Sequence, residues 1–503
     1  MVRLSPHRTV SRADGWRPPA LLTVVALLLM ALPVSRPDGA PRRMPGGIPN
    51  TPPMVGGFPL PFPRTADYRP REGSVVAVDI DGDGRVEIIV SLPSGILTVL
   101  NASGHTLPGW PRSFAGLPAP AYPLGDPGIG DLDGDGRPEI VTCVVSGTNP
   151  RRNDLYALKT DGSDLPGWPV SPTGPPNEYY SCSPGGLLVA DLDGDGRMEV
   201  ARGMSSGEVV GYDGDGRRLP GWPIRLAPDE NGHRRGINAD LAAADLDGDG
   251  AMEVLFVESG AAPKLLAVTG RGSFMPGFPL VLPEAVGRQP PVAGDLDGDG
   301  LPEIVQTTLA LSGDLPTAEP GTEPLLPAAL HVLGHDGREA QGWPRVLEGG
   351  SHWGALLTDL GGDGRPEIVV QDGDRLAAFD ARGALLAGFP APIHRDFLRT
   401  QGMEMSVWRA GDLDGDGSTD LLQVRSNIYA GATYLRVFGV DGSARAVHGF
   451  PFEAEGLMAA SQPVLVDLSS DGSPDLLLLA SAGTGGSWSL IAWDLGSLRP
   501  GVR

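Results

Sequence analysis

The nine residues that decide the fold are Asp79-Ile80-Asp81-Gly82-Asp83-Gly84-Arg85-Val86-Glu87. Carboxylates stand at positions 1, 3, 5 and 9 of this stretch, and glycines stand at positions 4 and 6. Seven further copies follow, beginning at Asp131, Asp191, Asp245, Asp295, Asp359, Asp412 and Asp467. Neighbouring copies start 50 to 64 residues apart. A period of this length is typical of a repeat protein, with one small structural unit per copy, stacked or closed into a ring.

The residue types in the repeat point to a hard cation. The acids at positions 1, 3 and 5 can converge on one point, because glycine permits turns with φ > 0 that aim them inward. Calcium takes six to eight oxygen ligands, so three monodentate aspartates, the backbone carbonyl at position 7 and a bidentate acid at position 9 would nearly fill its shell. A single copy could be an ordinary Asp-Gly turn. An acid recurs at position 9 in all eight copies, however, and this favours calcium.

The sequence therefore predicts up to eight calcium ions as cofactors. The predicted ligands, taken in chain order, are Asp79, Asp81, Asp83, Arg85, Glu87, Asp131, Asp133, Asp135, Arg137, Glu139, Asp191, Asp193, Asp195, Arg197, Glu199, Asp245, Asp247, Asp249, Ala251, Glu253, Asp295, Asp297, Asp299, Leu301, Glu303, Asp359, Asp363, Arg365, Glu367, Asp412, Asp414, Asp416, Ser418, Asp420, Asp467, Ser469, Asp471, Ser473 and Asp475. The residue at position 7 contributes its backbone carbonyl.

Two units depart from the full pattern. Unit six has Gly361 and unit eight has Ser469 at position 3, so each lacks one carboxylate, and we expect weaker calcium binding there. Position 12, which holds the bidentate acid of an EF-hand, is not acidic in any of the eight copies. The EF-hand is therefore excluded.

Each unit predicts four strands. In the first unit, apolar residues 74–78 run into the first aspartate, residues 88–92 leave the last acid, and residues 96–101 follow a turn. A fourth segment ends at Pro108-Gly109-Trp110-Pro111. Four strands per repeat make a propeller blade, so the sequence predicts an all-β, eight-bladed β-propeller.

A Gly-aromatic-Pro segment also repeats eight times. Its aromatic residues are Phe58, Trp110, Trp168, Trp222, Phe278, Trp343, Phe389 and Phe450. We interpret them as packing between blades rather than as a stacking platform for a ligand. The first copy precedes any complete blade, whereas the last unit ends soon after its third strand, residues 489–494. We therefore expect residues 55–63 to supply the outer strand of the last blade and close the ring.

The loops between the first and second strands resemble FG-GAP or VCBS repeats, the units of the integrin alpha-subunit propeller and of many secreted bacterial proteins. The resemblance covers residues 55–503. It implies the propeller fold, a calcium role for Asp79, Asp81, Asp83, Glu87 and their equivalents, and a link to cell adhesion. Integrin propellers have seven blades, whereas this chain has eight units, and no integrin ligand residue can be aligned with it.

The N-terminal region resembles a secretory signal. Residues 20–34 form an apolar stretch that follows four arginines, but no Ala-x-Ala cleavage site precedes the Pro-rich segment. Residues 1–40 are therefore expected to be a cleaved signal or an uncleaved anchor, residues 41–54 a linker, and residues 55–503 the propeller. In either case we expect a secreted, periplasmic or cell-surface protein, with membrane contact only through an uncleaved segment.

Charge and cysteine content narrow the partners and leave one question open. The formal net charge of −23 argues against a nucleic-acid partner. About half of the 62 acidic residues lie in the repeats, so metal binding accounts for much of this charge. Cys143 and Cys182, the two cysteines of the chain, could form a disulfide outside the cytoplasm or remain two buried thiols.

Ligand binding is expected at the opposite end of the blades from the calcium turns. The turns that join the second strand to the third and the fourth to the next blade emerge there, and they vary in length. Variable loops on a rigid scaffold commonly carry binding, although these side chains could equally be solvated at the rim. The candidate residues for a carbohydrate or protein ligand are Tyr179, Tyr180, His233, Arg234, Trp353, Arg399 and Trp408.

Three functions remain open. The favoured one is a binding or adhesion module. The others are a polysaccharide lyase of the rhamnogalacturonan class, in which some eight-bladed calcium propellers carry loops of this kind, and a structural envelope protein. The sequence shows no convergent acid and base set, so no catalytic residue is predicted.

Overall fold

The computed structural model describes residues 51–62, 73–92, 94–119, 121–147, 152–172, 182–228, 235–286, 289–309, 326–351, 354–392, 408–429, 432–482 and 487–499. All of them belong to the compact unit Ile48–Arg503. The predicted signal or anchor, residues 1–40, and most of the predicted linker lie outside the described residues. Within the described part of the chain, no helix is both long and apolar enough to cross a membrane.

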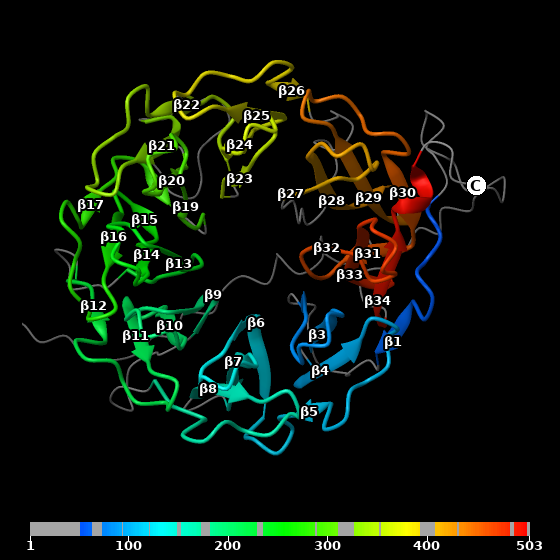
Figure 1. Cartoon of the computed structure of the whole chain (residues 1–503), viewed down its shortest axis with the longest axis horizontal. Coiled ribbons are helices and arrows are strands. Elements are labelled where there is room, and N and C mark those ends of the chain that lie inside the picture. The colour runs from blue at the N-terminus through cyan, green and yellow to red at the C-terminus, as the bar shows by residue number, and fades with distance from the viewer. Residues whose placement is uncertain are drawn as a thin grey trace, which may run out of the picture. The chain divides into compact units, whose positions relative to one another are not determined.

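The described residues form the predicted all-β propeller, whose sheets follow one another around a ring in chain order (Figure 1). Blade 1 contains β2 (Ser74–Val78), β3 (Glu87–Leu92), β4 (Ile96–Asn101) and β5 (Arg112–Ser113). Blade 2 contains β6 (Ala121–Gly130), β7 (Glu139–Ser146) and β8 (Arg152–Leu158), and its fourth strand is reduced to a bridge between Leu155 and Val170. Blade 3 contains β9 (Cys182–Ala190), β10 (Glu199–Met204), β11 (Glu208–Tyr212) and β12 (Ile224–Arg225). Blade 4 contains β13 (Ala242–Ala244), β14 (Glu253–Val257), β16 (Lys264–Val268) and β17 (Leu280–Val281), with a small extra sheet of β15 (Gly260–Ala261) and β18 (Ala285–Val286).

The second half of the ring repeats this plan. Blade 5 contains β19 (Val292–Gly294), β20 (Glu303–Thr307), β21 (Ala328–Leu333) and β22 (Arg345–Leu347). Blade 6 contains β23 (Leu356–Thr358), β24 (Glu367–Asp372), β25 (Arg375–Phe379) and β26 (Ala391–Pro392). Blade 7 contains β27 (Trp408–Gly411), β28 (Asp420–Tyr429), β29 (Ala432–Val440) and β30 (Phe452–Glu455). Blade 8 contains β31 (Leu457–Ala459), β32 (Val464–Val466), β33 (Asp475–Ala482) and β34 (Trp488–Asp494), followed by the short 3-10 helix η3 (Gly496–Leu498).

The N-terminal strand closes the ring as predicted. Strand β1 (Leu60–Phe62) pairs antiparallel with β34 and becomes the outermost strand of blade 8. The contact extends upstream, because the Asp494 N–H donates a 3.0 Å hydrogen bond to the Pro53 carbonyl. The last blade is therefore built from the two ends of the propeller.

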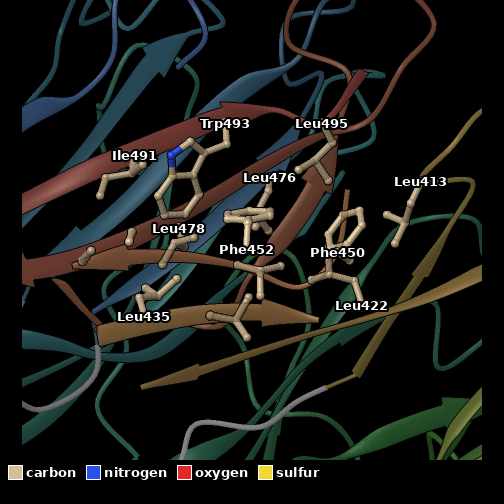
Figure 2. Packing of buried hydrophobic residues seen from close by; sticks show 14 of the residues in the cluster. Leu413, Leu422, Leu435, Phe450, Phe452, Leu476, Leu478, Ile491, Trp493 and Leu495 are labelled. Atoms are coloured by element: carbon tan, nitrogen blue, oxygen red, sulfur yellow. The ribbon is translucent and has the colours of Figure 1, made fainter. Parts of the chain in front are cut away.

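The hydrophobic core is divided into eight separate clusters, one at each junction between neighbouring blades. This explains why strands such as β3 are buried on both faces, since each face packs against a different blade. Figure 2 shows the junction of blades 7 and 8, where the ring of Phe452 meets that of Trp493 edge to face with centroids 5.6 Å apart. Edge-to-face contact is a favourable arrangement for buried aromatic rings.

The Gly-aromatic-Pro segments lie at these junctions, as predicted. The aromatic side chain is buried in all eight copies, and the following X-Pro peptide bond is cis in each. The indole N–H of Trp110 donates a 2.8 Å hydrogen bond to the Thr160 carbonyl in the next blade. Trp168, Trp222 and Trp343 make the same contact with the hairpin of the blade that follows each of them. The repeated segment is therefore a latch between neighbouring blades.

The open question about the cysteines is answered by the structure. Cys143 is fully buried in β7 and is disulfide-bonded, and the described residues hold no free cysteine. The second cysteine of the sequence, Cys182, begins β9 in the next blade. A disulfide here adds a covalent link between blades 2 and 3.

Candidate functional site

The acidic loops connect the first strand of each blade to the second, as predicted, so that all eight emerge at the same end of the blades. In blade 1 the loop leaves β2 after Val78 and enters β3 at Glu87. Its two glycines, Gly82 and Gly84, have φ of 77° and 81°. This left-handed conformation is easily reached by glycine, and it allows the chain to turn tightly around the carboxylates.

Backbone N–H groups orient each carboxylate of the loop. The two oxygens of Asp79 accept hydrogen bonds from Gly82 N–H at 2.7 Å and Gly84 N–H at 2.9 Å. Glu87, at position 9, accepts a 3.1 Å bond from Ile80 N–H. The bond to position 9 recurs in all eight loops, at distances of 2.7 to 3.1 Å. The loop therefore holds its carboxylates in place through the backbone.

The carboxylates converge closely enough to share one cation. Asp79, Asp81 and Glu87 each offer an oxygen that lies within 4.8 Å of the others. The equivalent acids of loops 2, 3 and 4 do the same, and in loop 5 the group consists of Asp295, Asp297 and Asp299. Oxygens on one calcium ion, each at 2.3 to 2.6 Å from it, are at most about 5 Å apart. The described donor set, which contains oxygen alone, fits a calcium ion at these positions.

The acid at position 9 is buried next to the other acids of its loop. Burial, aided by the aspartates of the same loop and opposed by the backbone N–H bond, raises the pKa of Glu199 and of Glu253 to about 7. The same causes raise the pKa of Asp420, at position 9 of loop 7, to about 6. A bound divalent cation would favour the ionised form of these acids.

Loops 6 and 8 keep the fold of the others with fewer acids. In loop 6, the N–H of Gly361 donates a 3.1 Å hydrogen bond to Glu367. In loop 8, Ser469 donates the equivalent 3.2 Å bond to Asp475, and the next residue, Ser470, has φ of 57° where the other loops have glycine. Loop 8 thus departs from the pattern at positions 3 and 4, and the sequence analysis identified only the change at position 3.

A lysine that follows β8 contacts loop 2 with its side chain, and the sequence analysis missed it. The ammonium group of Lys159 lies 2.7 Å from the carboxylate of Asp133, at position 3 of the loop. This hydrogen bond lowers the pKa of Asp133 and raises that of Lys159. Lys159 therefore occupies one of the oxygens that a metal ion would use. The only signal in the sequence was the rarity of lysine, which occurs twice in the chain.

Most of the predicted ligand-binding residues lie outside the described residues. This applies to Tyr179, Tyr180, His233, Arg234, Trp353 and Arg399. Trp408 is described, and its side chain is 8 % exposed in the hydrophobic cluster between blades 6 and 7. That position gives it a packing role, and its contact with a ligand stays a prediction.

Polar groups from blades 1 and 7 and from the segment before blade 4 lie near Asp126 of blade 2, which the sequence analysis did not single out. Asp126 lies in a bulge of β6, where the register with β7 shifts between Leu124 and Gly128. Its side chain reaches water, yet burial raises its pKa, with Asp240 raising it further and the Ser74 hydroxyl and Arg409 lowering it. These groups belong to blades 1 and 7 and to the segment before blade 4. Asp126 therefore faces the middle of the ring, where both charge signs are present.

A model of the FG-GAP-like repeat matches the chain four times, at residues 79–142, 131–202, 191–256 and 245–305. This chain carries FG-GAP-like repeats. The matched segments span the first five acidic loops, and the structure extends the same blade plan to the remaining three units. No curated protein matches the chain.

Several solved structures are similar to this chain at low sequence identity. The biofilm matrix protein Bap1 of V. cholerae is 14 % identical, with 88 % of this chain and 91 % of that chain covered and a TM-score of 0.38. The quinohemoprotein alcohol dehydrogenase ADHIIG of Pseudomonas putida HK5 is 14 % identical, covering 90 % and 78 %, with a TM-score of 0.45. The Dos1 propeller is 13 % identical, covering 89 % and 96 %, with a TM-score of 0.42. At these identities the likeness concerns the fold alone.

Proposed function

We propose that this chain is a calcium-binding FG-GAP propeller that serves as a binding or adhesion module for a carbohydrate or protein ligand outside the cytoplasm. The observation that carries the calcium assignment is the convergence of three carboxylates in loop after loop, such as Asp79, Asp81 and Glu87. Oxygen-only donors of this kind suit calcium better than softer metals, which prefer sulfur or imidazole.

The ion would have a structural role in each blade. It would neutralise acids that burial and mutual repulsion make costly to ionise, Glu199 among them. It would also hold the first and second strands of the blade together at the end where the loop joins them. When bound, calcium supplies charge and fixed coordination, and the proposal includes no reaction at these loops.

The ligand surface is proposed at the other end of the blades and toward the middle of the ring. The sequence predicts that the long connections at 172–185, 228–238, 309–327 and 392–409 belong to this end. The acidic Asp126 and the basic Arg409 are close enough to interact electrostatically. Together they suit a polar ligand that has both hydrogen-bond donors and acceptors.

The disulfide supports the extracytoplasmic assignment. A disulfide such as that of Cys143 persists outside the cytoplasm, where thiols are not kept reduced. Extracellular calcium is also abundant enough to fill weak sites. Secretion, periplasmic location and cell-surface display all satisfy these conditions.

Thermal unfolding with and without chelator tests the calcium assignment. The melting temperature of the purified protein should fall by many degrees when calcium is removed with EGTA and should recover when calcium is restored, because a ligand that binds the folded state alone stabilises it. Titration calorimetry should show several sites per chain. An unchanged melting temperature together with no heat of binding would overturn the assignment.

The ligand is tested separately. A glycan array and a binding screen against cell-surface extracts should identify a carbohydrate or protein partner, and substitution of Asp126 should weaken it. An absorbance assay on pectic polysaccharides distinguishes the binding module from a lyase, since only the lyase forms an unsaturated product. Silence in all of these assays would favour a structural envelope protein.

A further inference from the structure

Two peptide groups connect the acidic loops of neighbouring blades. The N–H of Met198, at position 8 of loop 3, donates a 3.0 Å hydrogen bond to the carbonyl of Asp131, the first residue of loop 2. The N–H of Met252, at position 8 of loop 4, donates a 2.9 Å bond to the carbonyl of Asp191, the first residue of loop 3. Loops 2, 3 and 4 are thus joined in a row, because the first residues of loops 2 and 3 each accept a bond from the loop that follows.

The same peptide group also belongs to the expected cation shell. The carbonyl of Arg197, at position 7, is the expected backbone ligand in loop 3, and it shares one peptide unit with the Met198 N–H. A cation on this carbonyl would draw electron density from the peptide and make its N–H a stronger donor. The cation of loop 3 would therefore strengthen the bond to loop 2. The Ala251–Met252 peptide stands in the same relation between loops 4 and 3.

Side-chain contacts reinforce the link between loops 2 and 3. Arg197 donates two hydrogen bonds, of 3.0 and 2.7 Å, to the carbonyl of Leu132 at position 2 of loop 2. That same residue donates its own N–H to the position 9 acid, Glu139. A shift of loop 3 would therefore move two expected ligand residues of loop 2, Asp131 directly and Glu139 through Leu132.

Proline at position 8 rules out this bond in four of the loops. Loops 2, 5, 6 and 8 have proline there, namely Pro138, Pro302, Pro366 and Pro474. Proline has no backbone N–H, so these loops cannot donate to the blade before them. Loop 5 nevertheless lies against loop 4. Leu301 is 3.4 Å from where a Cβ on Gly248 would be, and Arg197 is at the same distance from a Cβ on Gly134.

We propose that calcium binds cooperatively to loops 2, 3 and 4, with the position 8 N–H groups of Met198 and Met252 carrying the coupling. The inference rests on the proposed calcium function. Coupling is reciprocal, so a cation in either loop tightens binding in its neighbour. The proposal thus predicts a coupled row of three sites, and Pro302 at position 8 of loop 5 ends the row after loop 4.

Hydrogen-deuterium exchange of the full chain, measured at a series of calcium concentrations, reports on each loop separately. Asp193→Asn with Asp195→Asn weakens the loop 3 site while keeping the side-chain oxygens that accept backbone N–H. The calcium midpoint for protection of residues 131–139 should then rise by about five-fold or more. In the matched control, Asp297→Asn with Asp299→Asn weakens loop 5, and the midpoint for residues 245–253 of loop 4 should change by less than about two-fold.

A backbone variant isolates the hydrogen bond. Met198→Pro removes the donor and has a precedent in the four loops that carry proline at this position, whereas Met198→Ala keeps the N–H. The loop 3 substitutions should no longer move the loop 2 midpoint in Met198→Pro, and should still move it in Met198→Ala. The inference would be overturned if loop 4 shifted in the loop 5 variant as much as loop 2 shifts in the loop 3 variant, or if the coupling survived in Met198→Pro. If Met198→Pro does not fold, the contrast between the loop 3 and loop 5 variants still decides it. Exchange that does not respond to calcium in any loop would instead overturn the calcium function itself.

Discussion

The indole N–H of Trp168 donates a 2.9 Å hydrogen bond to the carbonyl oxygen of Gly214, 46 residues further along the chain and in the next blade. The glycine before it, Gly167, has φ of +94°, and a Cβ at that position would lie 2.0 Å from the carbonyl oxygen of Asp215. The aromatic residue can reach the next blade because the residue before it has no side chain. Each latch therefore depends on its glycine as much as on its aromatic ring.

Gly167→Ala is expected to lower the free energy of unfolding by about 3 kcal/mol or more, because it combines a left-handed backbone conformation with a clash against main chain. Urea unfolding measures this loss. Gly116→Ala is the control, since a Cβ there has no atom within 4 Å, and it should change stability by less than about 0.5 kcal/mol. Similar losses in both variants would show that the latch does not depend on the close approach.

Removal of residues 1–62 is expected to destabilise the ring far more than removal of residues 1–50. The longer deletion removes both β1 and the buried ring of Phe58, and it leaves the edge of β34 unpaired. Differential scanning calorimetry should show a melting temperature lower by ten degrees or more, roughly 2–4 °C for each kcal/mol lost. Equal melting temperatures for the two truncations would mean that the ring closes without its N-terminal strand.

Lys159→Met is expected to tighten calcium binding at loop 2. The lysine competes with the ion for the Asp133 carboxylate, so its removal should lower the calcium midpoint of that loop, as measured by hydrogen-deuterium exchange, by roughly three- to ten-fold. In the presence of EGTA the same variant should lose at most about 1 kcal/mol, because the pair is partly exposed. Lys264→Met, in β16, is the control and should leave loop 2 unchanged.

Gly361→Asp is expected to stabilise the protein when calcium is bound and to destabilise it when calcium is removed. The substitution restores the missing carboxylate at position 3 of loop 6 and places it near Glu367, whose oxygen lies 3.3 Å from the position of the new Cβ. With calcium bound, the added ligand should raise the melting temperature. In EGTA, repulsion between the two carboxylates should lower it. The same direction of change in both conditions would contradict a metal site in loop 6.

Stability is expected to fall in alkaline solution through His331. Burial lowers the pKa of His331, but hydrogen bonds with Glu284 and Glu339, at 3.1 Å each, outweigh it and raise the pKa to about 9. Because this value lies above the ordinary 6.5, the stabilisation is fully present below pH 6.5 and is lost as the pH rises through 9. The loss is expected to reach up to roughly 3 kcal/mol.

Urea unfolding at pH 6.5 and at pH 9.5, with saturating calcium to keep the loop acids ionised, measures the contribution of His331. His331→Gln should be less stable than the wild type at pH 6.5, and the difference between the two pH values should shrink. An equally steep fall in His331→Gln would assign the pH dependence to other groups.

The sequence predicted the fold because the decisive signals are local and repeated. The acids of a loop such as residues 79–87 lie within nine positions of one another, and the apolar runs on either side need no knowledge of distant contacts. The closure by β1 followed from counting strands at the two ends. The regular spacing of the repeats was therefore sufficient to predict the architecture.

Contacts that depend on how neighbouring blades are placed were not predicted. The pair of Lys159 and Asp133 spans 26 residues and requires the register of β8 against the loop. The bond from Met198 to Asp131 joins two repeats, so it depends on the distance and angle between blades. Asp126 reaches the middle of the ring through a bulge in β6 for which the sequence analysis had no signal.

The division of the core into eight junctions bears on how such a chain can arise and change. Each blade buries its apolar faces only against the blades on either side, and every latch reaches forward by a single repeat. Duplication of one segment of about 55 residues would supply a new blade with both of its partners already matched. Gene duplication can therefore lengthen this protein one blade at a time, and the number of blades is limited by the curvature that still lets β1 reach β34.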